Sequence, residues 1–126
     1  MPLTYEIDTE LGIVRITAQG TPSTQEQAAL AAQWTQDPGY RPGMPILLDN
    51  RLRTEPSDKA HIAEVTTEAQ RATFLQKGTR CAVVVATDAE FGMTRMFGSL
   101  SEEKPLVTKP FRDISAAEQW LLSGDD

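Results

Sequence analysis

The chain has 126 residues, 40% of them apolar and 24% charged, which predicts one globular domain over residues 1–126 rather than a disordered or fibrous protein. The net charge of −6 argues against nucleic acid as a partner, because duplex binding needs Lys and Arg to neutralise phosphates. No run of 18 apolar residues could span a membrane, the first residues lack a signal-peptide pattern, and the one cysteine, Cys81, excludes an internal disulfide. A cytoplasmic protein is therefore expected.

The first part of the chain predicts a hairpin followed by a helix. Residues 3–8 alternate apolar and polar side chains with the period of two that is typical of a half-exposed strand. Residues 13–18 form the returning strand of an antiparallel hairpin, with the first strand expected at the sheet edge. A capping box at residues 23–26 then starts a helix, in which Trp34 is interpreted as core packing rather than as a ligand platform.

Residues 46–48 predict the central strand, because they are apolar without alternation and so need cover on both faces. The strand is expected to end at Asp49, and the loop that follows carries Arg51 and Arg53. In open α/β sheets, ligands and partners sit beyond the carboxyl ends of the strands. This end of the central strand is therefore the first candidate site.

A second helix is expected from residue 57 or 58 to residue 76, followed by another apolar strand at residues 80–86. Two buried strands joined by a helix of this length favour a parallel pair with a right-handed crossover. Cys81 at the start of the second strand is interpreted as a small core residue.

The helix expected at residues 90–100 opens with a capping box at residues 87–90 and admits two interpretations. In the structural one it packs tightly on the sheet, and Gly92 allows a close approach of the backbone to a neighbour. In the functional one, Phe91, Met93 or Met96 points outward and forms an adaptable apolar contact surface.

The end of the chain predicts an edge strand and a docked helix. Pro110 removes one ladder donor from the strand at residues 106–112, which suits an edge position. A capping box at residues 115–118 is expected to start the closing helix. The predicted fold is thus α/β, with a mixed, mainly parallel five-stranded sheet, an N-terminal antiparallel hairpin and four covering helices.

Three segments carry a resemblance to a known family. The central strand ending in Asp49-x-Arg51, the helix around residues 91–97, and the closing strand at 107–112 with Asp113 and the Trp120 helix resemble the SpoIIAA-like family of bacterial proteins. This family lies within the STAS and CRAL-TRIO-like fold group, and the resemblance covers nearly the whole chain. It implies a STAS-like fold and a small, non-enzymatic binding domain.

One position departs from the wider fold group. Anti-sigma-factor antagonists of that group carry a phosphorylatable Ser just after the Asp that ends the central strand, whereas this chain has Asn50 there. Because Asn50 has no hydroxyl to phosphorylate, the resemblance does not carry partner switching over to this chain.

Two functional hypotheses follow, neither of them enzymatic. The sequence shows no Gly-rich phosphate loop, no His or Cys cluster and no nucleophile elbow, so no catalytic residue, cofactor or metal is expected. The first hypothesis is a protein-interaction or regulatory module, with a homodimer as one form of partner. The alternative is a carrier of a small amphipathic or lipid-like ligand, whose anionic head would meet Arg51 or Arg95. Both use the same candidate binding residues: Asp49, Arg51, Arg53, Phe91, Arg95 and Met96.

Overall fold

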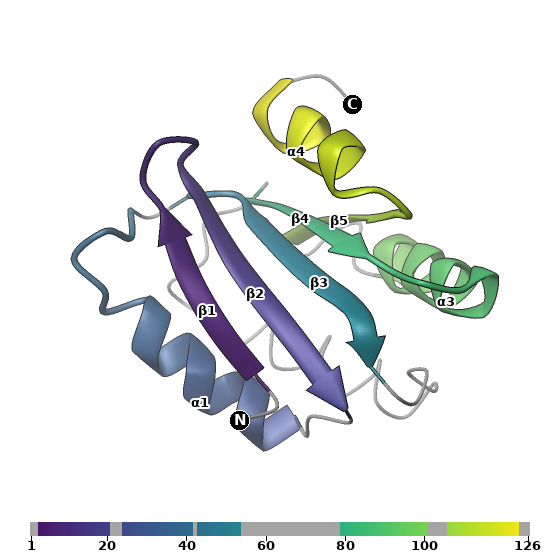
Figure 1. Ribbon diagram of the computed structural model, residues 1–126, viewed down its shortest axis with the longest axis horizontal. Helices are drawn as coiled ribbons and strands as arrows, with labels where there is room; N and C mark the ends of the chain where they lie inside the picture. The colour runs from purple at the N-terminus through teal and green to yellow at the C-terminus, as the bar shows by residue number, and fades with distance from the viewer. Residues whose placement is uncertain (1–2, 21–23, 42, 54–78, 101–105, 124–126) are drawn as a thin grey trace.

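In the part of the chain that the structure describes, five strands form one sheet in the order in which they occur along the sequence (Figure 1). The computed structural model describes residues 3–20, 24–41, 43–53, 79–100 and 106–123. The first strand is antiparallel to the second, and every later pair of neighbours is parallel. The predicted mixed, mainly parallel sheet with an N-terminal hairpin is therefore confirmed. The strands are β1 (Leu3–Asp8), β2 (Ile13–Gly20), β3 (Ile46–Arg53), β4 (Thr79–Val84) and β5 (Leu106–Phe111).

Among the described residues, three helices pack on this sheet: α1 (Thr24–Trp34), α3 (Asp88–Leu100) and α4 (Ile114–Ser123). Helix α1 packs on β1 and α3 packs on β5, while α4 lies over β3, β4 and β5 on the opposite face from α1 (Figure 1). The helix expected at residues 57–76 lies outside the described residues. No described helix combines the length and the apolar character that crossing a bilayer requires.

Helix starts agree with the capping predictions in one case and differ in another. Thr87 caps α3, because its Oγ1 accepts the N–H of Glu90 at 3.2 Å, as the capping box predicted. Helix α4 begins earlier than expected. The Asp113 carboxylate accepts the N–H of Ala116 at 3.0 Å, so Asp113, and not Ser115, is the N-cap.

Each face of the sheet has its own apolar cluster, as expected for central strands covered on both sides. Ile46 points into the cluster on the α1 side and Leu47 into the cluster on the α4 side, and both are buried. Trp34 is 4% exposed and meets Tyr40 edge to face with ring centroids 5.2 Å apart, which confirms its interpretation as core packing. Cys81 lies in the α1-side cluster, where burial raises the pKa of its thiol to about 12.

The two sheet edges are the strands that the sequence placed there. Phe111 accepts the N–H of Val85 through its carbonyl at 2.9 Å, so the backbone groups of Phe111 face β4. Backbone groups of successive strand residues alternate in direction, and those of Pro110 therefore point away from the sheet. The missing N–H of Pro110 interrupts the free edge of β5 and leaves the ladder to β4 intact.

Candidate functional site

Strand β3 continues through the segment that was expected to be a loop, so that expectation is wrong. Residues 49–53 stay in the sheet because β2 also extends to residue 20, and its last two residues pair with the end of β3. Thr17 pairs with Asp49, but Gln19 pairs with Leu52, which leaves one extra residue on β3. This irregularity places a β-bulge at the candidate site, where it changes the direction of the side chains that follow.

Asp49 and Arg51 form a two-point ion pair at this bulge. The guanidinium of Arg51 donates from Nε to Asp49 Oδ1 and from Nη2 to Oδ2, both at 2.9 Å, and its backbone N–H reaches Oδ1 at 3.1 Å. The Asp49 side chain is only 16% exposed, whereas that of Arg51 is 46% exposed. Asp49 therefore orients a cation that remains available to an outside group.

The charges of the pair stabilise one another. Burial disfavours the ionised Asp49 carboxylate, but the hydrogen bonds and charge of Arg51 outweigh it, so the pKa of Asp49 is lowered. The pKa of Arg51 is raised, mainly by its hydrogen bonds to Asp49 and to a smaller extent by the charge of Asp113. Both side chains are thus ionised at neutral pH.

Neighbouring strand ends contribute further charges that the sequence analysis missed. Arg112, directly after β5, donates from Nη2 to the carbonyl of Ala86 at 2.8 Å and pairs through Nη1 with Asp88 at the start of α3. Arg112 and Asp113 follow a parallel strand just as Asp49 and Arg51 end one. The same carboxyl-end argument could therefore have found them from the sequence.

We call the resulting group of five residues the carboxyl-edge cluster: Asp49, Arg51, Asp88, Arg112 and Asp113. Its three acidic and two basic side chains come from β3, from α3 and from the segment between β5 and α4. Because acidic and basic side chains lie beside one another, the cluster does not produce a strong electrostatic potential of one sign. Such a surface is suited to directional polar contacts with a folded partner rather than to attraction of a highly charged polymer.

The structure does not bring all six predicted binding residues together. Phe91 is half-buried and packs against the α1-side core, so the structural interpretation holds for this side chain. Arg95 is exposed on α3, and among the described residues no ion pair joins it to Asp49. Arg53 and Met96 belong to β3 and α3, but their side chains lie outside what the structure describes.

Gly92 does not play the packing role expected of it. In the described part of the chain, a Cβ added at this position would meet no heavy atom within 4 Å outside its own helix. Gly92→Ala should therefore raise the free energy of unfolding by about 0.5–1 kcal/mol, since alanine costs less backbone entropy in a helix. A shift of the urea midpoint to higher concentration checks this, and a lower midpoint would contradict it.

Asn50 follows Asp49 on β3 and is only 9% exposed. Its Oδ1 atom has no hydrogen-bond donor within reach in the described residues. A buried carbonyl oxygen without a donor is uncommon, because it loses its bonds to water without replacement. Asn50 is therefore a buried acceptor one residue away from an exposed cation.

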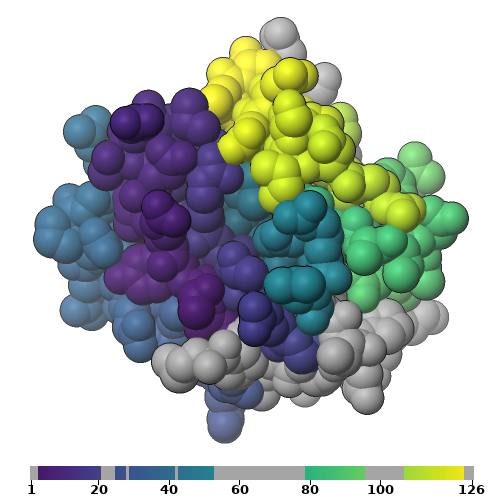
Figure 2. Space-filling model, in the orientation of Figure 1, coloured from purple at the N-terminus to yellow at the C-terminus, as the bar shows by residue number. Residues whose placement is uncertain are grey.

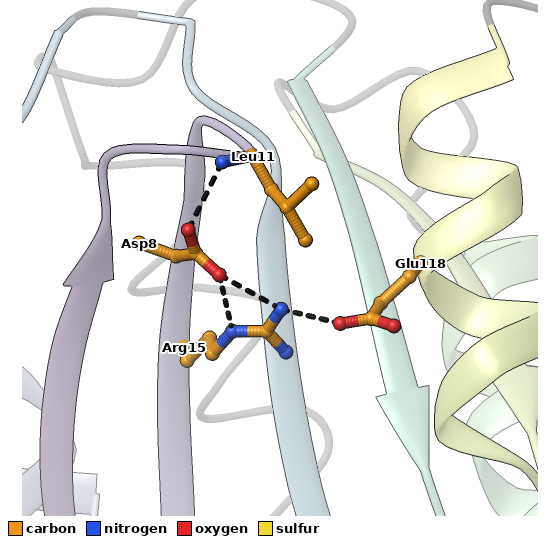
Figure 3. A network of polar contacts seen from close by, with 4 residues as sticks. All are labelled: Asp8, Leu11, Arg15 and Glu118. Atoms are coloured by element: carbon orange, nitrogen blue, oxygen red, sulfur yellow. Dashed lines mark hydrogen bonds and ion pairs between the residues drawn. The ribbon is translucent and has the colours of Figure 1, made fainter.

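A second polar network joins the hairpin to α4 (Figure 3). The Arg15 guanidinium binds Asp8 Oδ2 from Nε at 3.1 Å and from Nη2 at 3.0 Å, and Nη2 also pairs with Glu118. Asp8 in addition accepts the N–H of Leu11 at 3.0 Å, which holds the turn after β1 and lowers the pKa of Asp8 together with Arg15. This network fixes α4 against β2.

Comparisons with known proteins agree with this description. No protein-family model matches the chain, and no curated protein matches it. Its structure is similar to the crystal structure of an uncharacterised DUF3478-family protein from Shewanella loihica PV-4, described as having a SpoIIAA-like fold. The two are 17% identical, with a TM-score of 0.63, and the match covers 94% of this chain and 93% of the other. At this identity the likeness establishes the fold, and it confirms the SpoIIAA-like fold that the sequence resemblance predicted.

Proposed function

We propose that the chain is a non-enzymatic, cytoplasmic regulatory module of the STAS type that binds a protein partner through the carboxyl-edge cluster. The observation that carries the proposal is the Asp49–Arg51 pair. A partly buried carboxylate holds the guanidinium by two hydrogen bonds, and nearly half of the Arg51 side chain remains exposed. A cation fixed in this way loses little conformational entropy when a carboxylate or carbonyl of a partner binds it.

The location of the pair supports the same proposal. It sits at the carboxyl ends of the parallel strands, where α/β sheets place their binding sites. Asp113, in the segment that precedes α4, is close enough for its charge to act on Arg51, and the Arg112–Asp88 pair adds further polar groups at the neighbouring strand end. These groups can fix the orientation of a partner, while their mixed signs disfavour nonspecific anionic partners.

Arg51→Glu should abolish partner capture without unfolding the protein. The immobilised full-length chain would be incubated with lysate of its own source cells, and bound proteins quantified by mass spectrometry. We expect at least a tenfold loss of a specific partner with Arg51→Glu and a smaller loss with Arg51→Gln, which removes the charge without placing a second carboxylate beside Asp49. The matched control is Arg41→Glu, an exposed arginine in the segment before β3.

Circular dichroism melting of each variant separates loss of binding from loss of fold. If both Arg51 variants retain their fold and capture the same proteins in the same amounts as the wild type and Arg41→Glu, the proposed function is wrong. The expected losses at Arg51 alone, with all four proteins folded, would support it.

One observation favours a carrier of a small amphipathic ligand instead. The buried Oδ1 of Asn50 lacks a donor among the described residues, and a ligand hydroxyl or amide would satisfy it. Native mass spectrometry of freshly purified protein distinguishes the two functions. A discrete mass excess that disappears on denaturation would favour the carrier, whereas the mass of the bare chain would favour the interaction module.

A further inference from the structure

The outer side of β1 is an open row of backbone hydrogen-bonding groups. Val14 donates its N–H to the carbonyl of Pro45 at 3.0 Å, on the β3 side, so the backbone groups of Arg15 point toward β1. Arg15 pairs with Glu6, whose backbone groups therefore point toward β2. Their neighbours along β1 point away from the sheet, and no described strand pairs with them. These outward residues are Leu3, Tyr5 and Ile7.

The two edges of the sheet differ in how open they are. On β5 the outward position of Pro110 lacks an N–H, so an added strand would lose a bond there. Strand β1 has no proline among its described residues and offers three consecutive outward positions, each with a donor and an acceptor. A strand that adds to this sheet would therefore add to β1.

Helix α1 provides a surface on which the side chains of such a strand could pack. Among the strands, α1 packs mainly against β1, and Figures 1 and 2 show it extending past the outer side of that strand. Tyr5 and Ile7 are half-buried beside it, and the Tyr5 hydroxyl donates to Asp37 Oδ2 at 2.9 Å. Alternate side chains of an added strand would lie over α1 and gain apolar contact there.

The position of α1 also distinguishes between two possible partners for the edge of β1, a second copy of the chain and an extended peptide. A second copy that paired β1 with β1 around a two-fold axis would place both α1 helices on the same face of the joined sheet. Because α1 extends past β1, the two helices would occupy the same space beneath the junction. The site therefore fits an extended peptide segment that brings no helix of its own on that face.

The charges around β1 specify the peptide further. Glu6 is exposed on the face opposite α1, and the Asp37 carboxylate lies on the α1 side. The cation nearest to Glu6 across the hairpin is Arg15, which is already bound by Asp8 and Glu118. We propose that the outer edge of β1 binds an extended basic peptide segment as a sixth strand, with alternate side chains resting on α1.

The test uses the full-length protein and a fluorescein-labelled peptide of three Lys-Val repeats, with a Glu-Val peptide of equal length as its control. Fluorescence anisotropy should give a dissociation constant below about 1 mM for the basic peptide and at least fivefold weaker binding for the acidic one. Binding should slow hydrogen exchange at the Tyr5 and Ile7 amides, which are two of the three N–H groups that face the added strand.

Two matched comparisons test the proposal further, one between methylated peptides and one between variants of the protein. N-methylation of one alternate set of peptide amides should weaken binding at least tenfold, while methylation of the other set should weaken it less than threefold. Glu6→Lys should weaken the basic peptide about threefold or more. Glu10→Lys makes the same charge change in the turn beyond β1 and should stay within twofold of the wild type.

The proposal is independent of the carboxyl-edge cluster, and Arg51→Glu should leave peptide affinity unchanged. Strand addition is overturned if the basic peptide fails to bind below about 1 mM, or if both methylated sets bind equally well. It is also overturned if the Tyr5 and Ile7 amides exchange at the same rate with and without peptide. Equal binding of the acidic peptide would overturn the charge assignment.

Discussion

Trp34→Ala is expected to lower the free energy of unfolding by about 3–5 kcal/mol, the usual range for removing a buried indole from a core. Trp34 is 4% exposed, ends α1 and packs edge to face on Tyr40, which belongs to the segment leading into β3. Its removal leaves a cavity between α1 and the sheet that neighbouring side chains can close only in part. Equilibrium unfolding in urea, followed by far-ultraviolet circular dichroism, measures the change.

Gln33→Ala is the control for this experiment, because Gln33 is exposed on the same turn of α1. It should change the free energy of unfolding by less than about 0.5 kcal/mol. A loss below about 1 kcal/mol for Trp34→Ala would contradict the structure, since it would mean that the indole is not part of the core.

Arg15→Met is expected to cost about 1–2 kcal/mol of folding free energy at pH 7. The Arg15 side chain is 24% exposed, so the ion pairs lie between the small values of surface pairs and the larger values of buried ones. Methionine keeps the apolar stem but leaves the Asp8 and Glu118 carboxylates facing one another without a cation (Figure 3). Urea unfolding of both proteins at pH 7 gives the difference.

The loss of folding free energy caused by Arg15→Met should also depend on pH. Arg15 and the N–H of Leu11 lower the folded-state pKa of Asp8, so the stabilisation is present above the ordinary value of 3.8 and is lost as the pH falls through the lowered one. The gap between wild type and Arg15→Met should therefore narrow below about pH 4, where the carboxylates become protonated. A gap that stays constant down to pH 2.5 would show that Arg15 acts through packing alone.

Several features of the fold could be predicted because they follow from local patterns. The apolar run at residues 46–48 required a strand covered on both faces, and the structure places Ile46 and Leu47 in two different clusters. Pro110 marked an edge strand because proline has no N–H to donate to a neighbouring strand, and only an edge strand has a side without such a neighbour. The Thr87–Glu90 spacing marked a helix start because a Thr hydroxyl can accept the backbone N–H three residues later, as it does here.

The candidate site could be predicted only in part. The sequence placed Asp49, Arg51 and Arg53 at the end of an apolar strand, and the structure shows which arginine pairs with Asp49, namely Arg51. The sequence did not indicate that Arg95 would form no ion pair with Asp49, because a helix register does not fix how the helix is rotated on the sheet. Gly92 shows the same limitation, since its cost in helix propensity suggested a close neighbour that the described residues do not provide.

The sequence by itself determined the antiparallel hairpin, the edge strands, the buried central strands and the approximate positions of the three described helices, because each depends on periodicity or on the chemistry of single residues. Only the tertiary structure decided the continuation of β3 to residue 53 and its bulge, since both depend on pairing with β2. It alone also joined Arg15 to Glu118 and placed α1 beneath the edge of β1. These contacts link residues far apart in the chain, and no local pattern encodes the distance between them.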